Sequence, residues 1–164
     1  MTDALHIRPA VIPDELPVVR ELFREYADGL GVDLCFQGFE AELAGLPGAY
    51  TPPSGRLMLA VCGESVFGCV ALRRLSESDA EMKRLYVRPS ARGRGAGWGL
   101  VSALIVEAEM IGYRRILLDT LPTMTEAIRL YESVGFHPVE PYCHNPCPGT
   151  RYLALELGRQ TGAG

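Results

Sequence analysis

A compact cluster of positive charge is the first feature of this 164-residue chain that could do chemistry. Residues 83–94 read KRLYVRPSARGR, in which five side chains are basic and none is acidic. Because the whole chain has 16 Lys and Arg against 20 Asp and Glu, the remainder holds 11 basic and 20 acidic residues, a net charge of −9. A small positive island in an acidic protein favours a compact polyanion over nucleic acid, whose backbone needs a broad basic face. A solvated basic surface is the alternative.

A glycine-rich segment ends this basic stretch, because Arg92 to Gly97 reads RGRGAG. A strand pattern precedes the segment and a helical pattern follows it. Glycines at such a junction let backbone N–H groups approach a ligand without obstruction by Cβ atoms, and the start of a helix adds partial positive charge. The segment therefore predicts a phosphate-binding loop beside the basic island.

Three known patterns of phosphate-binding loop can be compared with this segment. A Walker loop ends in Gly-Lys-Ser/Thr, whereas this loop continues with GWG. The dinucleotide fingerprint GxGxxG fails in both registers, because Trp98 and Leu100 stand where its third glycine should be. The pattern RxxGxG is matched completely from Arg92 to Gly97. Asp119, about twenty residues on, imitates the ribose-binding acid of dinucleotide folds, so a dinucleotide-dependent enzyme stays as a weaker alternative.

The elements that must position the loop can be predicted from apolar spacing and turn residues. A first helix opens at about residue 13 and ends at the breakers Gly29 and Gly31. Further helices are expected at 39–46, 98–111 and 124–133, and strands at 5–8, 57–62, 66–73, 81–87, 116–119, 136–139 and 152–157. This order predicts one α/β domain with a mixed sheet and helices on both faces. The residues 98, 100, 101, 104 and 105 of the third helix are expected to lie in the core.

Three motifs in this order carry a family resemblance. They are LYVRP at 85–89, the RxxGxG loop, and AIxLYxxxGF at 127–136. With them, the stretch from Glu81 to Phe136, about a third of the chain, resembles the GNAT superfamily of acyl-CoA-dependent N-acetyltransferases. The resemblance implies a single GNAT domain over 1–164 with its cofactor core at about 81–136. It also implies a mixed sheet of about 6–7 strands, in which one strand pair splays apart at the cofactor site.

The resemblance implies acetyl-CoA as co-substrate. Its pyrophosphate would bind the amides around Arg94 to Gly97, and its pantetheine arm would pair with the backbone of the strand 85–87. The implied binding residues are Leu85, Tyr86, Val87, Arg92, Gly93, Arg94, Gly95, Ala96 and Gly97. One departure is visible, because many members carry an asparagine that contacts the pantetheine where this chain has Met124.

Acetyl transfer to an amine requires a proton acceptor. An alkylamine with a pKa of about 10.4 is mostly protonated at neutral pH, and freeing its lone pair costs roughly 4–5 kcal/mol. Some family members that acetylate amino groups carry a catalytic glutamate at the offset of Glu81, which makes Glu81 the implied base, acting through a water molecule. The alternative is an ordinary strand-end glutamate paired with Lys83 or an arginine.

The departing thiolate requires a proton donor, and Tyr131 occupies the family's tyrosine position in LYESVGF. A phenol can hydrogen-bond or protonate a thiolate, although the transfer is mildly uphill. The alternative for Tyr131 is a core tyrosine with a satisfied hydroxyl. A backbone N–H near Leu85 or Tyr86 would polarise the thioester carbonyl.

Few residues in the sequence indicate where the acceptor would bind. Tyr26 and Phe36 lie where family members build the acceptor wall, and simple packing is their alternative role. Tyr142 and Asn145 belong to a proline-rich loop that would edge the acceptor pocket, and they are candidate substrate contacts. The same loop contains Cys143-His144-x-x-Cys147, but a zinc site usually needs four ligands and no second pair is present, so no metal is expected. His6 and His137 are expected to be structural or exposed.

The composition of the chain limits which partners and which cellular location are expected. No stretch approaches about 18 consecutive apolar residues, so no membrane span is expected. The N-terminal residues lack a signal pattern, and five scattered cysteines favour a reducing cytoplasmic compartment. The GNAT resemblance implies an amine acceptor, either a small molecule or a protein amino group, and the acidic composition argues against nucleic acid as a partner. Dimers are common in the family, so the resemblance allows a homodimer. A non-catalytic sensor of acyl-CoA is the alternative function.

Overall fold

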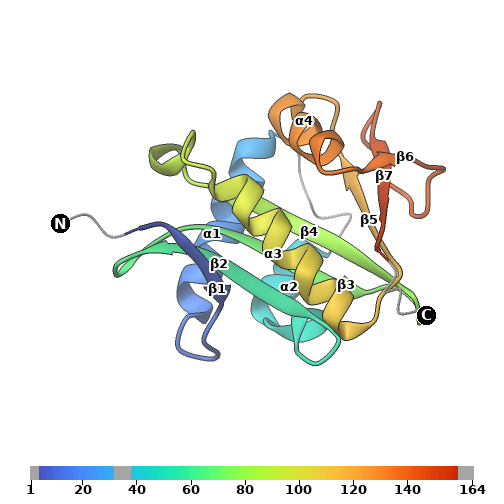
Figure 1. The fold of residues 1–164 in the computed structure, drawn as a ribbon. Helices are drawn as coiled ribbons and strands as arrows, with labels where there is room; N and C mark the ends of the chain where they lie inside the picture. The colour runs from blue at the N-terminus through green and yellow to red at the C-terminus, as the bar shows by residue number, and fades with distance from the viewer. Residues whose placement is uncertain (1–3, 32–37, 159–164) are drawn as a thin grey trace.

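Residues 4–31 and 38–158 are described by the computed structural model, in which one mixed sheet is flanked by helices (Figure 1). The strands are β1 His6–Pro9, β2 Arg56–Cys62, β3 Ser65–Arg74, β4 Asp79–Val87, β5 Arg115–Thr120, β6 His137–Pro138 and β7 Arg151–Glu156. The helices are α1 Leu16–Leu30, α2 Phe39–Ala44, α3 Ala96–Ile111 and α4 Thr125–Ser133, with short 3-10 turns at Gly48–Tyr50 and Pro89–Ala91. The expected order of elements is confirmed within a few residues at each boundary.

The sheet has 7 strands in the order β1-β2-β3-β4-β5-β7-β6. Neighbouring strands are antiparallel except β4 and β5, which run parallel. This is not the doubly wound parallel sheet that dinucleotide enzymes use, so the dinucleotide alternative is not supported by the fold.

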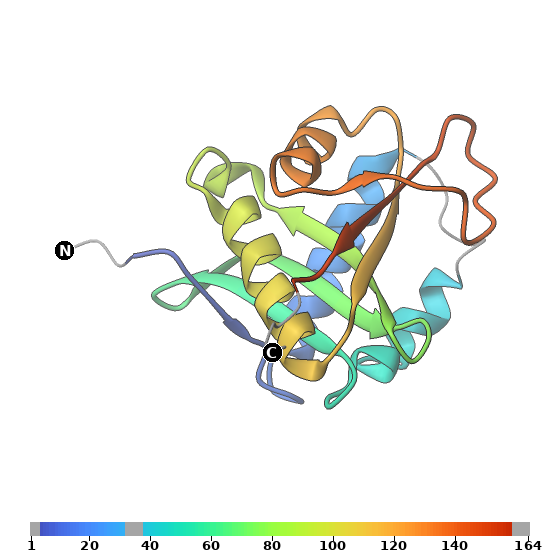
Figure 2. The ribbon, with the colours of Figure 1, turned by 45° about the vertical axis from the view of Figure 1, so that its right-hand side comes forward.

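The parallel pair opens partway along its length. β4 pairs with β5 only from Asp79 to Glu81, opposite Arg115 to Leu117. Beyond these positions both strands continue without pairing to each other, and they diverge toward their C-terminal ends (Figure 2). The prediction of a splayed strand pair is therefore confirmed.

A β-bulge lies on the open half of β4. Tyr86 pairs with Cys69 and Lys83 with Ala71, so β4 spends three residue steps where β3 spends two. Arg84 lies within this bulge, and its φ of 64° falls in the left-handed region. A bulge bends its strand and increases the local twist, and such features are frequent beside active sites. The bulge thus helps to turn the end of β4 away from β5.

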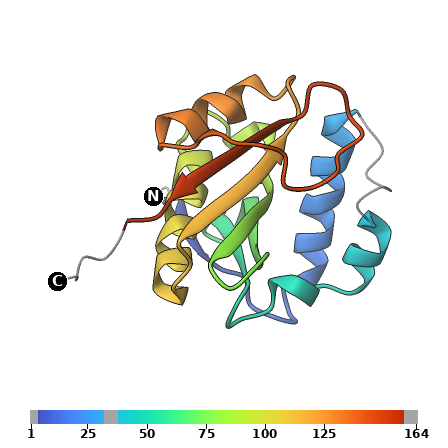
Figure 3. The ribbon, with the colours of Figure 1, turned by 90° about the vertical axis from the view of Figure 1, so that its right-hand side faces the viewer.

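Helices cover both faces of the sheet, as expected (Figure 3). One core lies beneath α3 and contains Met58 and Ala60 of β2, while the other lies beneath α1 and contains Leu57, Leu59 and Val61. The alternation follows from the two-residue period of a strand, which sends successive side chains to opposite faces.

The predicted core role of Trp98 is wrong. Its side chain is 60% exposed, and Ile105 is only half-buried, whereas Leu100, Val101 and Leu104 are fully buried. The helix is apolar on nearly all sides, so periodicity in the sequence does not reveal which stripe faces the sheet. No helix in the described part of the chain combines the length and apolarity needed to cross a membrane.

Candidate active site

Three adjoining cavities occupy the open end of the sheet. The first, which we call the loop cavity, has a volume of about 830 Å³ and lies between β4, the glycine loop, the end of α1 and the start of α4. It is lined by eight of the residues predicted from the sequence to bind a cofactor, namely Leu85, Tyr86, Val87, Arg92, Gly93, Gly95, Ala96 and Gly97. Arg94 does not line it, because its guanidinium lies 5.9 Å from the centroid of the Phe67 ring. Met124 does line it.

The glycine loop is shaped for an anion. Gly93 and Gly95 have φ values of 82° and 81°, which other residues adopt only with strain. Gly95 caps α3 without any side-chain hydrogen bond to the helix. The first N–H groups of α3 have no intrahelical partner and lie at the positive end of the helix dipole, so they can bind phosphate oxygens.

Gly97 widens the loop cavity by lacking a side chain. A Cβ atom built there would lie 3.4 Å from Leu130 Cδ2 and 4.0 Å from Val87 Cγ2, two side chains of the cavity wall. The groove between α3, α4 and β4 therefore passes over bare backbone at this residue. Together with the anion-binding N–H groups, this fits a narrow ligand that ends in phosphates.

The second cavity, the gap cavity, is a space of about 30 Å³ between the separated strands β4 and β5. Tyr131 of α4 lines it and is 6% exposed. Burial, together with the Tyr26 hydroxyl and the Asp119 carboxylate, raises the pKa of Tyr131, so its hydroxyl keeps its proton at neutral pH. Its ring packs against Phe136 at a centroid distance of 5.6 Å. Tyr131 is thus a fixed, protonated hydroxyl at the point where the sheet opens.

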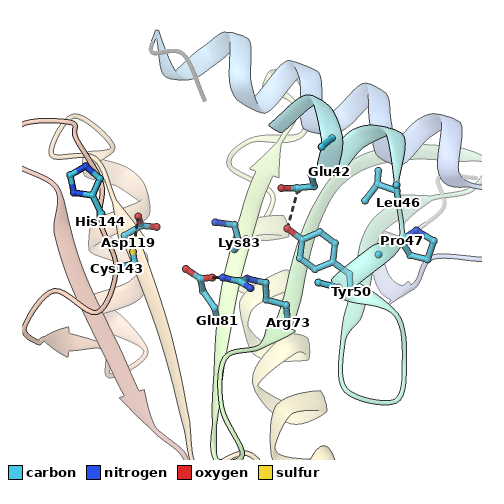
Figure 4. Close-up of a pocket in the computed structure, with 14 residues that line it drawn as sticks. Glu42, Leu46, Pro47, Tyr50, Arg73, Glu81, Lys83, Asp119, Cys143 and His144 are labelled. Atoms are coloured by element: carbon cyan, nitrogen blue, oxygen red, sulfur yellow. Dashed lines mark hydrogen bonds and ion pairs between the residues drawn. The ribbon is translucent and has the colours of Figure 1, made fainter. Parts of the chain in front are cut away.

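The third cavity, the outer cavity, has a volume of about 400 Å³ and is bounded by α2, the turn at Gly48–Tyr50, β3, β4 and the loop at 143–144 (Figure 4). Glu81 lies on its floor, 2% exposed. Its Oε1 accepts a 2.8 Å hydrogen bond from Arg73 Nε, and its Oε2 accepts a 2.6 Å bond from the Tyr142 hydroxyl. Both partners hold the carboxylate in a fixed orientation.

Shared lining residues show that the three cavities are neighbours. Tyr26, Leu85 and Met124 line both the loop cavity and the gap cavity. Lys83 and Asp119 line both the gap cavity and the outer cavity. A ligand in the loop cavity and another in the outer cavity can therefore meet at the gap, beside Tyr131.

A buried ion pair forms the wall between α2 and β4. Arg84 Nε and Nη2 donate to the two oxygens of Glu42 at 3.0 and 2.7 Å, and the Tyr50 hydroxyl donates to Glu42 Oε2 at 3.0 Å. The Arg84 guanidinium also lies over the rings of Phe39 and Tyr26, at 5.1 and 5.7 Å from their centroids. This network holds the bulge of β4 against the helical layer.

The predicted acceptor residues are only partly brought together. Tyr142 donates to Glu81 on the floor of the outer cavity but does not line that cavity itself, whereas Tyr26 lies at the junction of the other two cavities. Asn145 lines none of the three, since its Nδ2 donates to Asp119 Oδ2 at 3.0 Å and its Oδ1 accepts from the Cys147 N–H. Phe36 lies outside the described residues.

Several site residues escaped the sequence analysis. Arg73, Lys83, Asp119, Cys143 and His144 line the outer cavity. Three signals were available in the sequence. Lys83 begins the basic island, Asp119 was linked by its spacing to a different fold, and the loop at 143–147 was expected to edge a pocket. No group of three or more metal-ligating side chains is found among residues 4–31 and 38–158.

Known proteins share this architecture. The profile of the Acetyltransferase (GNAT) family matches residues 18–136. An uncharacterized N-acetyltransferase of Schizosaccharomyces pombe is 41% identical over 158 residues, which cover 94% of this chain and 96% of that protein. A GNAT-family acetyltransferase of Staphylococcus aureus has a TM-score of 0.79 at 18% identity, covering 94% of this chain and 100% of that chain. One from Elizabethkingia anophelis, solved with acetyl-CoA bound, has a TM-score of 0.61 at 22% identity, covering 94% and 99%.

The solved structures confirm the fold, and the family profile and the Schizosaccharomyces pombe relative also show the family. The profile spans well over half of the chain, and the yeast relative is similar along nearly its whole length. The resemblance inferred from the three sequence motifs is therefore confirmed. The chain is an acyltransferase that belongs to the GNAT acetyltransferase family.

Proposed function

We propose that this protein transfers the acetyl group of acetyl-CoA to a primary amino group by direct attack in a ternary complex. The observation that carries the proposal is the succession of three neighbouring cavities, in which the loop cavity and the outer cavity each share lining residues with the gap cavity between them. The acetyl-CoA bound to the Elizabethkingia relative supports the choice of donor.

The loop cavity would hold acetyl-CoA, which supplies the acetyl group as a reactive thioester. The N–H groups at the start of α3 would bind its pyrophosphate, and Arg92 adds positive charge beside them. The backbone of β4 from Leu85 to Val87 is unpaired on the side facing β5, so its N–H and C=O groups can pair with the amides of the pantetheine arm. A backbone N–H near Leu85 or Tyr86 can then donate to the thioester carbonyl oxygen.

Two side chains are proposed to move protons. The amine loses its proton toward Glu81 while its nitrogen forms a bond to the acetyl carbon, directly or through a water molecule. The Tyr131 hydroxyl donates to the sulfur as the carbon–sulfur bond breaks. The two residues line neighbouring cavities, Tyr131 the gap cavity and Glu81 the outer cavity.

Release of free thiol from acetyl-CoA on adding primary amines tests the proposal. We expect thiol release that depends on both the amine and the enzyme, and thermal stabilisation of the protein by coenzyme A. Stabilisation without thiol release for any amine would favour the acyl-CoA sensor. Stabilisation by NAD but not by coenzyme A would contradict the proposed co-substrate.

Gly97→Val is expected to weaken the binding of coenzyme A by about tenfold, equivalent to about 1.4 kcal/mol. The added side chain would project between Leu130 and Val87 into the loop cavity. Calorimetric titration with coenzyme A measures the effect, and Gly97→Ala, with a smaller side chain, should weaken binding less. If the valine variant binds coenzyme A as tightly as the parent protein, the cofactor does not pass over Gly97.

Glu81→Gln is expected to remove the acidic limb of the pH–rate profile and to lower turnover by about a hundredfold, at the low end for loss of a general base. Glutamine keeps the size of the side chain and can still accept the hydrogen bond from Arg73. Steady-state rates measured across the pH range would show the change. Asp79→Asn is the control, because Asp79 lies on the same strand and pairs with Arg115, away from the three cavities. An acidic limb that persists in Glu81→Gln would assign the proton to another group.

A further inference from the structure

The gap cavity lies where the proposed reaction needs to hold the acyl group. It shares lining residues with the loop cavity on one side and with the outer cavity on the other. The thioester of a coenzyme A bound in the loop cavity would therefore reach the acceptor there. The gap volume of about 30 Å³ matches that of a single water molecule in the liquid. A methyl group is similar in size to a water molecule, so the gap suits the methyl end of an acetyl group.

The walls that β4, β5 and α4 contribute to the gap cavity are fixed by packing. Met82 and Leu118 belong to the core beneath α3, and their side chains are 4% and 2% exposed. Tyr131 belongs to the same core, where its ring packs against Phe136. Side chains in a close-packed core move aside only at a cost in strain. These walls therefore resist expansion of the gap cavity around a larger acyl group.

The wall toward α1 is held by the buried arginine of β4. The Arg84 guanidinium lies 5.7 Å from the centroid of the Tyr26 ring, and both residues line the gap cavity. The same guanidinium is bound to the two carboxylate oxygens of Glu42. Tyr26 thus packs against a residue that is itself anchored, so this wall is also fixed.

On the acceptor side the gap cavity ends at charged groups. Lys83 and Asp119 line both the gap cavity and the outer cavity. Methylene groups that extended this way would lie against polar atoms, whose removal from water is costly. They would also occupy the space through which the amine has to arrive. A longer acyl chain is therefore left with the side of the gap that faces the start of α4.

Met124 stands at that side of the gap. It directly precedes α4, lines both the gap cavity and the loop cavity, and is half-buried outside the two cores that the described residues form. Its Sδ accepts a 3.7 Å hydrogen bond from Thr120 Oγ1, which ties the side chain to the end of β5. A methionine side chain is unbranched and adaptable, so its contacts decide where it lies. Here the contact with Thr120 directs it over the end of the opened strand pair.

We propose that Met124 restricts the acyl donor to acetyl-CoA by closing the gap cavity against longer acyl chains. The methyl group of the acetyl lies among Met82, Leu118 and Met124, and Thr120 is the positioning residue that holds the Met124 side chain. The inference rests on the proposed acetyl transfer and specifies which acyl group is transferred. The chemistry is the same for every acyl-CoA. The bond from the amine nitrogen to the acyl carbon forms, the carbon–sulfur bond breaks, the amine proton passes to the base, and coenzyme A leaves as the thiol.

The test compares acetyl-CoA, propionyl-CoA and butyryl-CoA as donors to one primary amine that the protein acetylates. Thiol release should give a kcat/KM for propionyl-CoA at least about tenfold below that for acetyl-CoA, the low end for one extra methylene in a closed apolar pocket. Butyryl-CoA should be poorer still. Equal kcat/KM values for the three donors would overturn the proposal while leaving acyl transfer intact. No thiol release from any donor with any primary amine would overturn acetyl transfer itself and this inference with it.

Variants of Met124 locate the selectivity. Met124→Ala should raise kcat/KM for propionyl-CoA, so that the ratio of acetyl-CoA to propionyl-CoA falls toward one. Met124→Leu, a swap that conserves volume, should keep the ratio of the parent protein. Thr120→Val removes the hydroxyl that holds the Met124 sulfur and should lower the ratio by a smaller factor. A ratio that stays at the parent value in Met124→Ala would assign the selectivity to another wall and contradict the proposal.

The matched control is Met110→Ala. Met110 is 73% exposed on α3 and lines none of the three cavities. Its truncation removes the same side chain as Met124→Ala, so this variant should keep both the rate and the donor ratio of the parent protein. A donor ratio that falls equally in Met110→Ala and Met124→Ala would show that the effect does not come from the gap cavity, and would overturn the role of Met124.

Discussion

Tyr131→Phe is expected to lower kcat by about a hundredfold while leaving the affinity for coenzyme A nearly unchanged. The hydroxyl is lost at the gap between β4 and β5, and the ring, which packs on Phe136 at 5.6 Å, keeps its place. Because burial holds the pKa of Tyr131 above its usual range, the parent hydroxyl is a hydrogen-bond donor throughout neutral pH. The variant leaves the departing thiolate without that donor. Single-turnover and steady-state measurements of thiol release would give the change in rate.

The control for Tyr131→Phe is Tyr113→Phe. Tyr113 is also buried, and its hydroxyl donates to the Ser54 carbonyl at 2.7 Å, but it lines none of the three cavities. That variant should lose about 1 kcal/mol of stability through one hydrogen bond and keep its turnover. If Tyr131→Phe turns over the preferred acceptor at the parent rate, the thiolate is protonated by another group and Tyr131 is a packing residue.

The glycine loop could be predicted from the sequence because it is local. Its function depends on six consecutive residues between a strand and a helix, and eight of nine predicted cofactor residues do line the loop cavity. Arg94 is the exception, because its guanidinium lies over the Phe67 ring instead.

The outer cavity could not be predicted in the same way because its parts meet only through the sheet order. Glu81 and Tyr142 are separated by 61 positions and Arg84 and Glu42 by 42. Asp119 faces Lys83 because β5 inserts between β4 and β7, a placement that apolar periodicity does not encode. The predicted core position of Trp98 is wrong for a related reason. Its helix is apolar on nearly all sides, so the sequence does not indicate which face meets the sheet.

Glu42→Gln is expected to destabilise the fold by about 3 kcal/mol, at the low end for breaking a buried ion pair because Glu42 keeps 17% exposure. The Arg84 side chain is only 2% exposed, so the variant leaves a buried guanidinium without its counter-charge. Arg84 also holds a left-handed φ of 64°, a conformation that costs roughly 1–2 kcal/mol for a residue with a side chain. Loss of the pair therefore also removes what holds the bulge of β4 in place.

The pH dependence of stability provides a second measure of the same pair. Burial alone would raise the pKa of Glu42, but the hydrogen bond and charge of Arg84 lower it below the ordinary value of 4.5. A lowered folded-state pKa means that the pair stabilises the fold fully above pH 4.5, and that this stability is lost as the pH falls through the folded-state value. Glu42→Gln should therefore flatten the decline of stability below pH 4.5.

Urea denaturation at neutral pH and thermal melting would quantify the loss, with a decrease in Tm of about 6–12 °C expected for a chain of this size. Glu40→Gln is the matched control on the same helix, because the Glu40 carboxylate is 71% exposed and lies 3.7 Å from an exposed Arg24. Exposed pairs of this kind contribute about 0–1 kcal/mol, so that variant should melt close to the parent protein. Equal stability losses in the two variants would mean that Arg84 is solvated or re-paired, and that the bulge of β4 is held by the sheet alone.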